Sequence, residues 1–146
     1  MIIVDLNALL YAVNADGPHH EAAKPWLEDL LSGDEVVALP WVVLLGFLRL
    51  STNPRIFPSP LDPEQALEVV DGWLSHASVR PLSPGGEHWR ILRSLLLEAG
   101  TAGDLTTDAH LAALAIAHGA ELHSTDTDFA RFPYLRWVNL LERWSR

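Results

Sequence analysis

Short apolar runs alternate along the chain with longer segments whose apolar residues recur every three or four positions. The short runs predict buried strands at residues 2–5, 36–39, 79–82 and 121–124, with a weaker candidate at 137–140. The longer segments predict helices at residues 6–13, 20–31, 41–50, 62–74, 87–98 and 107–118. Strands that alternate with helices from end to end favour an α/β domain with a parallel sheet.

Proline and glycine mark the boundaries between these elements. Residues 52–60 contain three prolines and predict an ordered loop rather than a linker between domains. Asp62 is a candidate N-cap with Pro63 in the first helical position, and Gly119 suits the C′ position after helix 107–118. With 146 residues, the chain is expected to form one domain, residues 1–146.

Composition and charge exclude several classes of protein. The chain has no cysteine, so it has neither disulfides nor thiolate metal sites. No apolar stretch approaches the length of a membrane span, and the first five residues do not resemble a signal peptide, which predicts a cytoplasmic protein without membrane contact. A net charge of −9 argues against a general binder of phosphate backbones, but a nuclease remains compatible because a metal neutralises its catalytic acids.

Four aspartates stand where apolar segments meet turns or helix starts. Asp5 closes the first apolar run, Asp108 lies at the start of the helix predicted from residue 107, and Asp126 and Asp128 follow the strand predicted at 121–124. Each alone could be a helix cap or part of an Asx turn. Ligand sites in parallel sheets form beyond the carboxyl ends of the strands, and clustered carboxylates favour Mg²⁺ or Mn²⁺. Together they indicate metal-dependent phosphodiester chemistry.

Several segments resemble a known family. Residues 4–10, with Asp5 and Asn7, are similar to the opening D-x-N segment of PIN-domain ribonucleases, and residues 107–115 and 124–129 are similar to their later acidic motifs. Residues 47–55 and 128–132 resemble segments of VapC-type toxins from toxin–antitoxin pairs. The resemblance covers nearly the whole chain, with its motifs in family order.

The resemblance implies a three-layer α/β/α sandwich with a central, mostly parallel sheet. It also implies an endoribonuclease that depends on Mg²⁺ or Mn²⁺, cuts structured RNA such as tRNA or rRNA, and is silenced by a cognate VapB-like antitoxin. Carried over by position, Asp5, Asp108 and Asp126 would be the metal ligands and Asp128 a further acid of the site. Asn7 and Thr125 match polar positions that would orient ligands or the substrate phosphate.

The chain departs from the family pattern at Gly46. The family usually carries a glutamate there, and no acid occurs between Glu35 and Asp62 that could replace it. Asp104 is a candidate for a compensating acid. The departure motivates a second hypothesis, in which the domain is a catalytically weak PIN fold that binds RNA or protein.

A phosphatase of the haloacid-dehalogenase type is a third, less favoured hypothesis. That chemistry requires an aspartate two residues after Asp5, where Asn7 stands, and a lysine near the site, whereas the only lysine is Lys24. A zinc site is disfavoured because His110 and His118 lie two helical turns apart.

Arginines and apolar side chains suggest contacts with partners. Arg49 and Arg55 are candidates for RNA phosphate contacts, although Arg49, like Arg131, could instead form a structural ion pair. The apolar helix 41–50 and the side chains of Leu92, Leu95 and Leu96 exceed what a small core requires. This excess predicts a homodimer face or an antitoxin groove.

Overall fold

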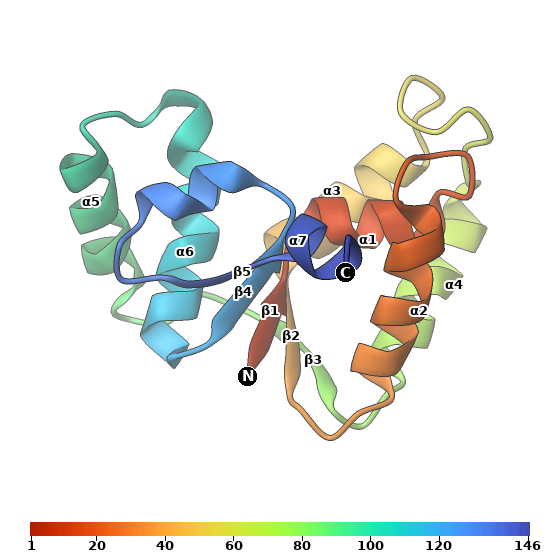
Figure 1. Ribbon diagram of the computed structural model, residues 1–146, viewed down its shortest axis with the longest axis horizontal. Helices are drawn as coiled ribbons and strands as arrows, with labels where there is room; N and C mark the ends of the chain where they lie inside the picture. Colours follow the sequence, from red (N-terminus) through yellow and green to blue (C-terminus); the bar gives the residue numbers. More distant parts are fainter.

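Five parallel strands form one sheet in the computed structural model, which describes residues 1–146 (Figure 1). The strand order is β3-β2-β1-β4-β5. Their bounds are β1 (Ile2–Val4), β2 (Val37–Pro40), β3 (Val79–Leu82), β4 (Glu121–Ser124) and β5 (Arg136–Asn139). All four neighbouring pairs are parallel, so the sheet predicted as mostly parallel is wholly so.

Helices cover both faces of this sheet and complete the predicted three-layer sandwich (Figure 1). One side carries α1 (Leu6–Val13), α2 (His20–Leu31), α3 (Trp41–Ser51) and α4 (Pro63–Leu74). The other side carries α5 (His88–Ala99) and α6 (Thr106–His118). Two 3₁₀ turns, η1 (Gly103–Leu105) and η2 (Thr127–Arg131), flank α6 and β4, and the short α7 (Leu140–Trp144) follows β5.

The last strand and the last helix differ from expectation. The weak strand predicted at 137–140 begins and ends one residue earlier, because Leu140 starts α7. The side chain of Leu140 is fully buried, and the Asn139 side chain caps the new helix by accepting from the Leu141 backbone N–H at 3.1 Å. A helix of five residues is too short to establish a helical period in the sequence, so its apolar residue was read as part of the strand.

The hydrophobic core is one cluster of 34 buried residues. The residues of β1 are buried on both faces, as expected for a central parallel strand. Helix α6 is rich in buried alanine, including Ala109 and Ala112, so its backbone can approach the sheet closely. Such packing fixes the first turn of α6 relative to the ends of the neighbouring strands.

Helix α3 is apolar except for Arg49 and Ser51 in its last turn, but it is only partly buried. Phe47 is fully buried and packs edge-on against Trp73, with ring centroids 4.6 Å apart, whereas Trp41 and Leu45 are exposed. Leu95, expected to contribute to a partner face, belongs to the core instead. Exposed apolar side chains therefore lie on α3, at Trp41, Val42 and Leu45, and also on α5, at Trp89 and Leu97. None of the helices combines the length and the hydropathy that a membrane span requires.

Candidate metal centre

Three aspartates meet at the carboxyl-terminal edge of the sheet. Asp5 directly follows β1, Asp126 directly follows β4, and Asp108 lies in the first turn of α6. All three line one pocket of about 170 Å³, together with Asn7. The remaining lining comes from α1, α3 and α6: Leu6, Val42, Val43, Thr107 and Leu111.

The fourth aspartate joins the cluster from η2. One carboxylate oxygen from each of Asp108, Asp126 and Asp128 lies within 4.8 Å of the others, a spacing at which one cation could contact all three. Asp128 is exposed, and its backbone N–H donates to the Asp126 carboxylate at 2.9 Å. Asp5, predicted as a metal ligand, is not one of these three; it is buried and lines the same pocket.

Ser124 connects two of these acids, a role that was not predicted from the sequence. Its hydroxyl donates to the Asp5 carboxylate at 2.6 Å and accepts from the Asp126 backbone N–H at 3.0 Å. The Leu6 backbone N–H donates to the other Asp5 oxygen at 2.7 Å. Both carboxylate oxygens of Asp5 are thus held in place. The spacing Ser124-Thr125-Asp126 was visible in the sequence, but the contact with Asp5 joins residues 119 positions apart.

Burial and mutual repulsion disfavour the ionised carboxylates of the cluster when no cation is bound. Burial raises the pKa of Asp108, and the charges of Asp126, Asp5 and Asp128 raise it further, to about 7. Burial also raises the pKa of Asp5; the hydrogen bonds from Ser124 and Leu6 oppose this shift, and Asp126 adds to it. No lysine or arginine lines the pocket to balance these charges. Oxygen donors of this kind suit a hard divalent cation such as Mg²⁺ or Mn²⁺.

The sequence matches the PIN domain over residues 2–134. The chain belongs to the PIN-domain family. Among curated proteins, Ribonuclease VapC33 of Mycobacterium tuberculosis is 45% identical over 141 residues, which span 97% of this chain and 99% of the relative. Ribonuclease VapC37 of the same species is 46% identical over 137 residues, or 94% of this chain and 95% of the relative.

Solved structures share the PIN fold with this chain. The crystal structure of VapBC2 from Rickettsia felis, bound to a DNA fragment from its promoter, matches with a TM-score of 0.68 at 24% identity, covering 94% of this chain and 98% of that one. The structure of VapBC-1 from nontypeable Haemophilus influenzae matches with a TM-score of 0.66 at 18% identity over the full length of both chains.

Of the remaining predicted site residues of this PIN domain, one lines the acidic pocket and two do not. Asn7 is exposed and lines the acidic pocket. Thr125 is buried and lies outside the pocket lining, and Asp104 is exposed in η1, also outside it. Of the three supporting residues, only Asn7 lies where it could contact a substrate in the pocket.

The two arginines expected to contact RNA also lie outside the pocket. Arg49 and Arg55 are exposed, on α3 and in the loop after it. The alternative of structural ion pairs is wrong, because neither Arg49 nor Arg131 is within ion-pair distance of an acid.

Gly46, where PIN domains usually carry a glutamate, faces an apolar part of the site. It is buried in α3, and a Cβ atom there would lie 2.7 Å from Cδ2 of Leu6, a residue that lines the acidic pocket. Val42 and Val43 line the same wall. The pocket is therefore acidic on one side and apolar on the side where the further carboxylate was expected.

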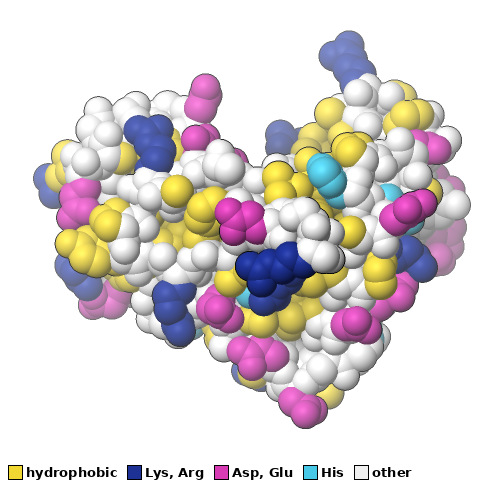
Figure 2. Space-filling view, viewed as in Figure 1, with side chains coloured by type: hydrophobic (Ala, Val, Ile, Leu, Met, Phe, Trp, Pro, Cys, Tyr) yellow, Lys and Arg dark blue, Asp and Glu magenta, His cyan; other side chains and the backbone are white.

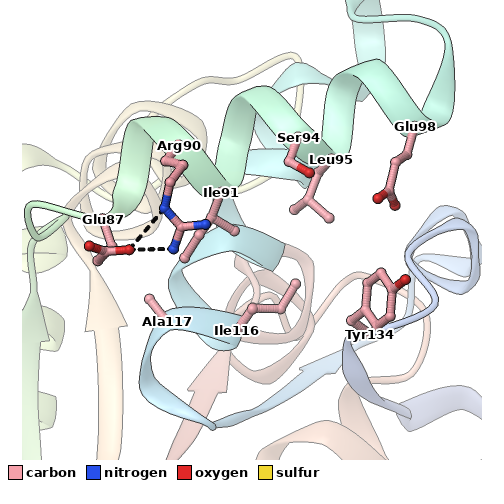
Figure 3. A pocket seen from close by; sticks show the side chains of 9 residues that line it. All are labelled: Glu87, Arg90, Ile91, Ser94, Leu95, Glu98, Ile116, Ala117 and Tyr134. Atoms are coloured by element: carbon pink, nitrogen blue, oxygen red, sulfur yellow. Dashed lines mark hydrogen bonds and ion pairs between the residues drawn. The ribbon is translucent and has the colours of Figure 1, made fainter.

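Two features outside the acidic pocket were not predicted. His110 pairs with His88 of α5, their ring nitrogens 2.8 Å apart, and burial lowers the pKa of both. A larger hollow of about 430 Å³ lies between α5, the end of α6 and Tyr134 (Figure 3). Its acids are Glu87, which is paired with Arg90, and Glu98. Without clustered acids, it is not a candidate for metal-dependent chemistry.

Proposed function

We propose that this protein is a divalent-metal-dependent endoribonuclease, the VapC-like toxin of a toxin–antitoxin pair. The observation that carries the proposal is the convergence of Asp5, Asp108 and Asp126 in one pocket. The curated relatives named as ribonucleases support RNA as the substrate. Structured RNA such as tRNA or rRNA is the class of substrate that the family resemblance favours.

In this proposal, Asp108, Asp126 and Asp128 hold a Mg²⁺ or Mn²⁺ ion, and Asp5 completes the site from its buried side. The bound ion would lower the pKa of a coordinated water and neutralise charge on the scissile phosphate. Ser124 and the Leu6 N–H keep the Asp5 carboxylate oriented toward the pocket. Asn7, at the exposed rim, offers amide donors to a phosphate oxygen.

A VapB-like antitoxin is the proposed regulatory partner. The structural neighbours are VapBC complexes, and the acidic surface of this chain, with net charge −9, favours a partner of opposite charge. We further propose a homodimer, supported by the exposed apolar side chains of Trp41, Val42 and Leu45 on α3.

Metal titration and metal removal test the proposal together. Calorimetric titration with Mn²⁺ is expected to show binding that Asp126→Asn removes, and the protein is expected to cleave bulk tRNA with Mn²⁺ but not with excess EDTA. Cleavage that persists in EDTA would contradict the metal-dependent mechanism. No Mn²⁺ binding at millimolar concentration would favour the alternative suggested by Gly46, a PIN fold that binds RNA or protein without cutting.

Metal affinity is expected to depend on pH with a break near 7. A protonated carboxyl cannot bind the ion, and the pKa of Asp108 is raised to about 7 in the metal-free protein. The apparent Mn²⁺ affinity should therefore fall about tenfold for each pH unit below 7 and level off above it. Calorimetry from pH 5.5 to 8.5 measures the profile. A flat profile above pH 5 would show that Asp108 ionises normally and would contradict this prediction.

A further inference from the structure

We propose that Arg143 and Arg146, together with Trp137, form a binding site for the RNA backbone beside the acidic pocket. The inference rests on the proposed nuclease function, since it concerns how the same substrate is held. These residues line a hollow of about 260 Å³ together with Val138, Asn139 and Glu142.

The register of the sheet places this hollow near the acids. Strand β5 pairs with β4 so that Asn139 lies opposite Ser124, the residue that holds Asp5 and Asp126. Helix α7 then starts at the same carboxyl-terminal edge of the sheet; it carries Arg143, and Arg146 follows two residues after its end. Figure 2 shows basic side chains gathered in the middle of this face, beside α7.

The arginines are not engaged by the protein itself. Neither Arg143 nor Arg146 is within ion-pair distance of an acid, although Glu142 lines the same hollow. Arg143 lies close enough to β4 to affect His123: burial lowers the pKa of this histidine, Glu121 opposes the shift, and the charge of Arg143 adds to it. Both guanidinium groups in the lining of the hollow therefore lack an ion-pair partner, and that of Arg143 lies near the strand that leads to Asp126.

Binding of RNA at the acidic pocket requires basic side chains nearby. RNA is a polyanion, and a chain of net charge −9 whose pocket has no basic side chain repels it. Guanidinium groups bind phosphate oxygens in bidentate fashion. The Trp137 ring is half-buried and held by its N–H, which donates to the Ser124 carbonyl at 3.3 Å, so its open face could stack against a base.

The salt dependence of RNA binding tests the site. The probe is a fluorescein-labelled single-stranded RNA of mixed sequence, titrated by anisotropy in Ca²⁺ buffer at several KCl concentrations. Loss of two phosphate contacts in Arg143→Gln/Arg146→Gln should make the slope of log K against log salt shallower by about 1.4. The matched control Arg80→Gln/Arg93→Gln removes the same charge from exposed positions on β3 and α5 and should change the slope little.

A lysine pair separates charge from folding. Arg143→Lys/Arg146→Lys keeps both charges and should retain the slope of the wild type while binding more weakly, because lysine cannot bind phosphate in bidentate fashion. If the glutamine pair changes the slope no more than the control pair does, the hollow does not bind the RNA backbone and the inference is wrong. The proposed nuclease is judged separately: Mn²⁺ binding and EDTA-sensitive cleavage by the wild type with an unchanged slope would overturn only this inference.

Discussion

Asp108→Asn is expected to reduce metal-dependent RNA cleavage by about 10³-fold or more while the protein stays folded. The variant removes one of the three carboxylates that lie within 4.8 Å of one another. The fold should tolerate the change because the ionised Asp108 carboxylate destabilises the folded protein when no metal is bound. Burial and the charges of Asp126, Asp5 and Asp128 raise the pKa of Asp108 to about 7. Above pH 7 its carboxylate is ionised and is repelled by these three neighbours. A neutral amide removes that repulsion.

Thermal unfolding with and without Mn²⁺ distinguishes this explanation from misfolding. At pH 8 the metal-free variant should have a Tm no lower than the wild type, but Mn²⁺ should no longer raise it. Asp104→Asn is the matched control, since Asp104 is an exposed acid four residues earlier and outside the pocket. Full cleavage by Asp108→Asn, or an equal loss in the control, would refute the assignment of Asp108 to the centre.

Ser124→Ala is expected to weaken Mn²⁺ binding by about 10- to 100-fold, the usual cost of losing a residue that orients a metal ligand. The hydroxyl holds the Asp5 carboxylate at 2.6 Å and the Asp126 backbone at 3.0 Å, and Ser124 is fully buried. Alanine leaves the Asp5 oxygen without its donor at a fully buried position. Because this hydrogen bond lowers the pKa of Asp5 against the effect of burial, its loss should raise that pKa further.

The pH profile of Mn²⁺ binding tests this positioning role. In Ser124→Ala the pH range over which affinity falls should move upward, which a merely structural defect would not cause. Thr127→Ala, an exposed hydroxyl in the neighbouring η2 turn, serves as control and should bind Mn²⁺ like the wild type. Wild-type affinity and an unchanged profile in Ser124→Ala would mean that Asp5 is held by the Leu6 N–H alone.

The alternation of elements was predictable because burial leaves a local signature. The first strand is central and buried on both faces, so it reads as an unbroken apolar run, and Asp5 is conspicuous at its end. Asp62 and Pro63 were likewise predicted as the start of a helix, because both are local signals. The hydrogen bonds between Asp62 and Gln65 that complete the capping box were not predicted. The assignment of Leu140 to a strand was wrong because α7 is too short for its apolar residues to show a helical period.

The sequence by itself determined the order of elements, the PIN-domain resemblance and the four aspartates, since each depends on neighbours along the chain. Only the tertiary structure decided which side chains meet. The register of β1 against β4 brings Ser124 to Asp5 across 119 positions, and the packing of α1 against α3 sets Leu6 over Gly46, where the family's glutamate was expected. A periodic pattern records which face of an element is buried, but not which residue of another element lies opposite it.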